Sequence, residues 1–130
     1  MNRIEKSLDL KKQGYNCAQA VIIAYADVVN LDEELAQNIG AGFGSGLGNM
    51  KGTCGAILGG GCIMGIAFKD KVVSKSFSKE IMTKFEASNK STVCYDLKGI
   101  GTGTPLRSCM GCVSDTAQLV EDILKREGKL

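Results

Sequence analysis

Apolar residues along this chain recur at intervals of three and four positions, which is the spacing of one face of an α-helix. No stretch of useful length alternates apolar and polar residues as a strand would, and no internal repeat is present. The pattern predicts helices over residues 2–13, 17–29, 32–39, 54–68, 72–89 and 109–127, with a short helical turn over 92–98. The expected fold is all-α: a compact, single-domain bundle of about five to six helices that covers residues 1–130.

Two of the expected helices have a clear inward face. In 72–89 the apolar residues stand at four-residue steps, at Val73, Phe77, Ile81 and Phe85. In 109–127 the residues predicted to point inward are Val113, Ala117, Val120 and Leu124.

Glycine stands at every second position from Gly40 to Gly48, and each glycine costs a helix about 1 kcal/mol relative to alanine. We therefore expect an irregular loop here that reaches Gly52. Helix 54–68 also contains several glycines, so tertiary contacts must hold it. Because small residues let neighbouring backbones approach closely, this glycine-rich helix is expected to be the central one.

Composition excludes several classes of function. The net charge of +2, the absence of a long basic run and the scarcity of aromatic residues argue against nucleic-acid binding. Residues 52–68 carry no charge but are too short and too rich in glycine to span a membrane. The first residues are charged and lack the apolar segment of a signal peptide, so we expect a cytoplasmic protein.

Four cysteines follow residues that favour helix N-caps. The pairs are Asn16 with Cys17, Thr53 with Cys54, Ser108 with Cys109, and Thr92 two positions before Cys94. A cysteine at a helix N-terminus faces free backbone N–H groups and the positive end of the helix dipole. Both favour the thiolate, which is the form that binds metals and attacks disulfides.

The residue types that are present limit the chemistry further. Six cysteines without a secretion signal argue against a disulfide framework and favour metal binding or catalytic thiols. Histidine is absent, which excludes Cys2His2 zinc sites, Rieske centres and Cys–His nucleophile pairs. Lys51, Lys98 and Arg107 each lie near a cysteine segment and could balance thiolate charge.

Several of these motifs together resemble the C_GCAxxG_C_C family of redox-active proteins. They are the run from Asn16 to Ala20, the glycine-rich segment 40–48, the block Thr53-Cys54-Gly55-Ala56-x-x-Gly59, a single Cys94, and Cys109 with Val113. The resemblance covers nearly the whole chain and implies a small redox protein with one four-cysteine site. Its members here are Cys17, Cys54, Cys94 and Cys109, whereas Cys62 and Cys112 do not match the pattern. We expect Cys62 to be a core residue.

An iron–sulfur cluster suits four cysteine ligands and is our first expectation for the cofactor. Gly55 and Gly59 would allow backbone N–H groups to lie close to the cluster sulfurs. Zinc accepts the same ligand set, but structural zinc sites usually contain two CxxC-like pairs, and this chain has one.

The metal-free alternative is thiol–disulfide chemistry at Cys109 and Cys112, one helical turn apart. A structural zinc protein without catalytic activity is the third alternative. Electron transfer would require a redox partner that the sequence does not name, and the Gly/Ala faces of the helices would permit a homodimer.

Overall fold

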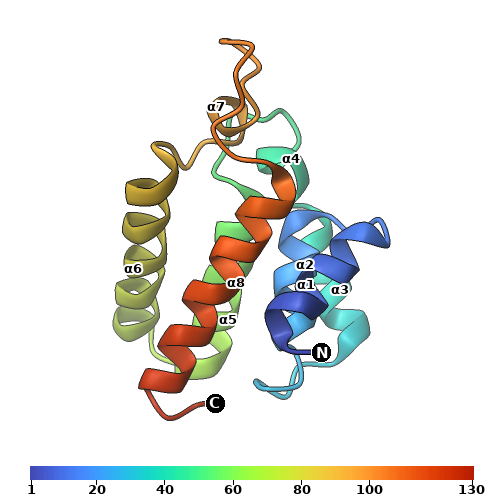
Figure 1. Ribbon diagram of the computed structural model, residues 1–130. Coiled ribbons are helices and arrows are strands. Elements are labelled where there is room, and N and C mark those ends of the chain that lie inside the picture. Colours follow the sequence, from blue (N-terminus) through green and yellow to red (C-terminus); the bar gives the residue numbers. More distant parts are fainter.

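The computed structural model describes residues 1–130 and contains helices but no strands. The helices are α1 (Arg3–Lys12), α2 (Cys17–Tyr25), α3 (Glu33–Ala41), α4 (Gly44–Leu47), α5 (Gly55–Phe68), α6 (Lys71–Asn89), α7 (Cys94–Leu97) and α8 (Cys109–Arg126). In Figure 1, α8 lies in front of α5, with α6 on one side and α1, α2 and α3 on the other. The one-turn helices α4 and α7 cover one end of this bundle. The all-α prediction is confirmed.

The expected count of five to six helices is too low, because the glycine-rich segment forms a turn of its own. In α4 the backbone of Ser45 and Gly46 lies in the left-handed region, with φ of 52° and 56°. This turn is therefore not a regular right-handed helix, which explains why a helical pattern did not reveal it. Glycine adopts a positive φ without a steric penalty.

The second helix is shorter than predicted, since α2 ends at Tyr25 rather than near residue 29. The Leu31 N–H donates to the carbonyl oxygen of Ala26 at 2.8 Å. Asn30 has a φ of 55°, so the chain leaves the helix through a left-handed residue. This turn directs the chain to Asp32, whose side chain caps α3 by accepting from the Leu35 N–H at 3.0 Å.

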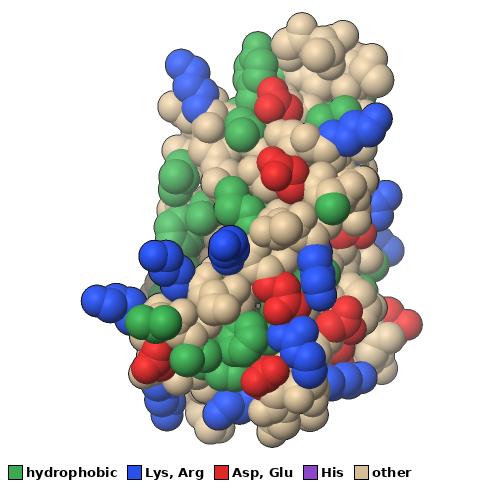
Figure 2. Space-filling view, turned by 90° about the vertical axis from the view of Figure 1, so that its left-hand side faces the viewer, with side chains coloured by type: hydrophobic (Ala, Val, Ile, Leu, Met, Phe, Trp, Pro, Cys, Tyr) green, Lys and Arg blue, Asp and Glu red, His purple; other side chains and the backbone are tan.

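The inward faces are largely as predicted. Val113, Ala117, Val120 and Leu124 of α8 are fully buried. Ile81 and Phe85 of α6 are buried and Phe77 packs against the core, but Val73 is 39% exposed in the first turn of that helix. The face of the molecule on the α6 side is mixed, with basic and acidic side chains interspersed and hydrophobic side chains between them (Figure 2).

Helix α5 contacts α2, α6 and α8, and its glycines explain how closely it approaches two of them. A Cβ atom on Gly59 would lie 2.8 Å from the carbonyl oxygen of Ala18 in α2. A Cβ atom on Gly60 would lie 3.1 Å from Thr116 Cγ2 in α8. A side chain at position 59 would force α2 and α5 to shift, and one at position 60 would crowd Thr116.

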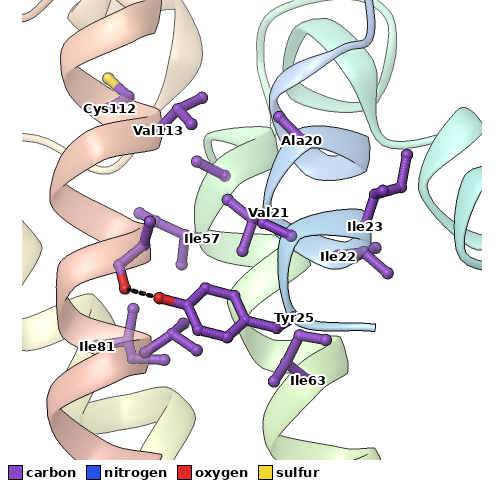
Figure 3. Close-up of a cluster of buried hydrophobic side chains, with 14 of the residues drawn as sticks. Ala20, Val21, Ile22, Ile23, Tyr25, Ile57, Ile63, Ile81, Cys112 and Val113 are labelled. Atoms are coloured by element: carbon purple, nitrogen blue, oxygen red, sulfur yellow. Dashed lines mark hydrogen bonds between the residues drawn. The ribbon is translucent and has the colours of Figure 1, made fainter. Parts of the chain in front are cut away.

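The core beside α5 also contains a buried polar contact. The Tyr25 hydroxyl lies 2.7 Å from the Ala117 carbonyl oxygen and 2.8 Å from Glu121 Oε2 of α8. Figure 3 shows this ring among Ile57, Ile63 and Ile81. Tyr25 thus ties α2 to α8 in the middle of the bundle.

Candidate cysteine site

The helices that begin with cysteines start at the same end of the bundle, beside α4 (Figure 1). Their cysteines line one small cavity of about 30 Å³, formed by Cys17, Cys54, Cys94, Cys109 and Cys112. The cavity is otherwise lined by Ser45, Gly46, Gly55, Leu97, Lys98 and Arg107. It contains no carboxylate, so every strong metal donor among its side chains is a thiol.

Two of the predicted caps hold their cysteines as expected. Asn16 Oδ1 accepts from the Gln19 N–H at 2.8 Å, and the Gln19 side chain accepts from the Asn16 N–H at 3.0 Å. Ser108 Oγ accepts from the Gly111 N–H at 3.0 Å. These bonds fix Cys17 and Cys109 as the first residues of α2 and α8.

The predicted caps at Thr53 and Thr92 are wrong. Cys54 is itself the residue that precedes α5, and Val93 precedes α7. Thr53 and Val93 instead form an antiparallel bridge, in which the Cys54 N–H donates to the Thr92 carbonyl at 2.8 Å. Because this pairing holds the backbone extended, each helix begins one residue later than a threonine cap would place it.

The glycine-rich segment encloses the cavity. Gly46 has a φ of 56°, and a Cβ atom there would lie 2.6 Å from Cys94 Cβ. A Cβ atom on Gly55 would lie 3.0 Å from the Phe43 carbonyl oxygen and 3.4 Å from the Ala18 nitrogen. These two positions let α4, α5 and the start of α2 meet around the cysteines. The alternating glycines in the sequence marked the segment that contains Gly46. No sequence pattern indicated that Leu97 or Ser45 would line the cavity.

Within the cavity, Cys17 and Cys109 form one hydrogen-bonded pair. The Cys17 thiol donates to the Cys109 sulfur, which raises the pKa of Cys17 and lowers that of Cys109. Burial also raises the pKa of Cys17, while Lys98 and Lys11 lower that of Cys109. Cys109 is therefore favoured as the thiolate of this pair.

Cys54 and Cys112 form the second pair. The Cys112 thiol donates to the Cys54 sulfur, which lowers the pKa of Cys54, and the backbone N–H groups of Ala56 and Ile57 lower it further. The same bond raises the pKa of Cys112, and burial raises it as well. Figure 3 shows Cys112 beside Val113 at the edge of the apolar core.

Cys94 completes the cavity, and the pKa of its thiol is raised by burial. Lys98, on the following turn of the chain, opposes that shift. Arg107 also lines the cavity but is held by Asp115, with Nε to Oδ2 at 3.1 Å and Nη2 to Oδ1 at 3.0 Å. Lys51, predicted to assist, is exposed and outside the cavity lining.

The structure thus gathers Cys17, Cys54, Cys94 and Cys109 and adds Cys112 to them. Cys62 lies elsewhere: it is half-buried in α5 and packs against the core. Gly55 lines the cavity, whereas Gly59 lies one turn further along α5 against Ala18.

The geometry defines what this site can do. All six cysteines are free thiols. No three of the chain's cysteine or carboxylate side chains converge closely enough to hold a single metal ion. The sulfurs line a small cavity instead, and the thiols of two pairs lie close enough to shift each other's pKa.

Comparison with known proteins identifies the family. The family model described as "Putative redox-active protein (C_GCAxxG_C_C)" matches residues 15–123, a span that includes all five cavity cysteines. The chain matches no curated protein and no solved structure. None of its helices has the length and apolar character needed to cross a lipid bilayer. The match covers most of the sequence, and the chain therefore belongs to the C_GCAxxG_C_C family.

Proposed function

We propose that this protein is a small cytoplasmic electron carrier whose cysteine cavity binds an iron–sulfur cluster through Cys17, Cys54, Cys94 and Cys109. One observation carries the proposal: four cysteines from the starts of four helices line one cavity that contains no histidine and no carboxylate. A donor set made only of thiols is the set that iron–sulfur clusters use.

Ligand spacing is the property by which a cluster and a single zinc ion would differ at this site. A cluster contains several iron atoms, so its cysteine ligands lie farther apart than the ligands of one zinc ion, which share a centre at about 2.3 Å. No three ligands converge in this conformation, so either group would require the cysteine side chains to rearrange on binding. The cavity itself measures about 30 Å³, so binding of a cluster would require the side chains that line it to move apart.

The chain also offers groups that would stabilise thiolate ligands. Backbone N–H groups at the starts of α2, α5 and α8 and the cation of Lys98 would offset the charge of four thiolates. Leu97 and Gly55 line the cavity and would limit access of water. When bound, the cluster would supply one-electron oxidation and reduction, and a partner protein would supply or accept the electron.

The test is anaerobic reconstitution with iron and sulfide, followed by measurement of iron, sulfide and zinc per chain, visible absorption and EPR. We expect a coloured protein that contains iron, and loss of colour in single serine variants of Cys17, Cys54, Cys94 and Cys109. Cys62→Ser is the matched control, since Cys62 lies outside the cavity, and it should retain the iron. A colourless protein without iron would refute the proposal, and stoichiometric zinc would favour the structural alternative.

A second candidate function is thiol–disulfide exchange without a metal. The observation that favours it is the contact between the sulfurs of Cys17 and Cys109. Cys109 would attack as the thiolate and Cys17 would resolve the mixed disulfide. We predicted a Cys109–Cys112 pair from the sequence, but in the structure each of these two cysteines contacts a cysteine of another helix. Disulfide mapping after turnover with a disulfide substrate distinguishes the two pairings.

A further inference from the structure

The cavity contains one more cysteine than a four-cysteine site needs. Cys112 lies in the first turn of α8 and lines the cavity with the other four. It is 3% exposed, and Cys54, its hydrogen-bonding neighbour, is 5% exposed. Both are therefore shielded from bulky reagents but open to the cavity.

Helix packing holds these two cysteines together. Gly60 of α5 lies close to Thr116 of α8, since a Cβ atom on residue 60 would lie 3.1 Å from Thr116 Cγ2. One turn earlier on each helix lie Ala56 and Cys112, and Cys54 stands immediately before the start of α5. The close approach further along the helices thus brings Cys54 and Cys112 into contact at the cavity.

We propose that Cys54 and Cys112 form a reversible disulfide, produced by a peroxide, that removes Cys54 from the cluster-binding set. The inference rests on the proposed cluster site for its consequence, but the disulfide itself does not depend on any cofactor. Because both side chains line the same cavity of about 30 Å³, the bond requires only local movement of two side chains to reach the S–S length of about 2.05 Å.

The chemistry balances with hydrogen peroxide as the oxidant. The Cys54 thiolate attacks one peroxide oxygen, the O–O bond breaks, and Cys54 becomes a sulfenic acid while hydroxide leaves. The Cys112 sulfur then attacks the Cys54 sulfur, and the sulfenic oxygen leaves as water with the Cys112 proton. Two thiols lose two electrons in total, and the peroxide is reduced to two water molecules after protonation of the hydroxide. A dithiol reductant reverses the bond by thiol–disulfide exchange.

Burial determines which oxidant suits this site. Hydrogen peroxide is close to water in size and can reach thiols inside a cavity that larger disulfide reagents enter poorly. Cys17 and Cys109 are only half-buried and are therefore more accessible to larger reagents. The two pairs should thus differ in the oxidants that act on them.

The first test uses the metal-free protein and hydrogen peroxide at one equivalent, with differential alkylation and mass spectrometry of the linked peptides. We expect a Cys54–Cys112 disulfide in the wild-type chain and its loss in Cys112→Ser and in Cys112→Ala. Circular dichroism checks that the variants fold, and Cys62→Ser is the control that should keep the disulfide. Finding Cys54 linked to Cys17 or Cys109, or finding Cys112 reduced in the oxidised protein, would overturn the proposal.

The second test measures iron loading. Peroxide-treated wild-type protein should take up less iron than the reduced protein, and a dithiol should restore the loss. In Cys112→Ser the loss should not be restored, because a sulfenic acid without a resolving thiol oxidises further to the irreversible sulfinic acid. Equal restoration in both proteins would contradict a protective role for Cys112. If the reduced wild-type protein binds no iron while the disulfide still forms, the cluster proposal fails and the disulfide assignment stands.

Discussion

The cysteine end of the bundle and its apolar centre are built differently, although the same helices supply both. At the cysteine end, capping side chains and a short backbone bridge position the helix starts around a cavity. In the centre, fully buried side chains such as Ile63 pack around Tyr25 without a comparable cavity (Figure 3). The difference indicates that α2, α5 and α8 carry the candidate chemistry in their first turns and the stability of the fold in the turns that follow.

The largest effect on stability is expected from Ile63→Ala in the centre. Ile63 is fully buried in α5, so truncation removes apolar contacts and leaves a cavity that costs about 2–5 kcal/mol. Urea unfolding measures the loss, and thiol titration of the native state should still count the same accessible cysteines. Val73→Ala, at a position that is 39% exposed, is the control and should cost far less. A small loss at Ile63 would mean that the centre does not dominate the stability.

Two glycines of α5 test where the helix approaches its neighbours. Gly59→Ala places a Cβ atom 2.8 Å from a backbone oxygen of α2, and overpacking of this kind costs about 1–3 kcal/mol. Gly65→Ala meets no atom within 4 Å and should instead stabilise the helix by up to about 1 kcal/mol. Thermal and urea unfolding should therefore shift in opposite directions for the two variants. Equal shifts would contradict the packing described for α2 and α5.

Tyr25→Phe tests the polar contact in the centre. The variant leaves Glu121 and the Ala117 carbonyl without the hydroxyl, at a cost of about 1–2 kcal/mol. Burial and the bond to Glu121 raise the pKa of Tyr25 above its ordinary value of about 10. As the pH rises, Tyr25 therefore loses its proton in the unfolded chain before it does so in the folded protein. Its contribution to the free energy of unfolding is full below pH 10 and declines as the pH rises above 10.

The measurement for Tyr25 is the free energy of unfolding between pH 8 and pH 11, as the difference between the wild-type protein and Tyr25→Phe. Taking the difference removes the titration of groups that both proteins share. The difference should shrink above about pH 10. A difference that grows with pH would refute the assigned hydrogen bond.

At the cysteine end, Asn16→Ala should cost about 1 kcal/mol through loss of the α2 cap. The variant also loses the bond from Asn16 Nδ2 to the Gly40 carbonyl, 3.1 Å long, which holds α3 against the start of α2. Asn16→Asp is the matched control, since it keeps the capping oxygen. The free energy of unfolding, measured with urea, should therefore fall less in Asn16→Asp than in Asn16→Ala.

The smallest effect on stability is expected from Cys109→Ser. Cys109 is only half-buried, so the change should cost about 0.5 kcal/mol or less. The same variant should abolish iron binding if the proposed cluster forms. A large loss of stability with intact iron binding would contradict the assignment of chemistry to the cysteine end and of stability to the centre.

Several elements of this molecule followed from local sequence. The caps at Asn16 and Ser108 and the buried face of α8 were predicted, because they depend on residues within one or two helical turns. The caps at Thr53 and Thr92 were mispredicted because these residues belong to the bridge between 53 and 93, a pairing that no local pattern reveals. The predicted end of α2, near residue 29, was also too late. The helix ends at Tyr25, and the chain then turns through the left-handed residue Asn30.

The sequence by itself determined the donor chemistry: six thiols, no histidine, and cysteines at or near the starts of several helices. Only the tertiary structure decided which thiols meet. Cys112 joins the cavity because it lies in the first turn of α8, whereas Cys62 follows Cys54 by eight residues and lies about 12 Å further along α5. The contact of Cys54 with Cys112 likewise depends on how closely α5 packs against α8. Segments far apart in the chain are brought together by burial of their apolar faces, and that packing has no signature in the spacing of the cysteines.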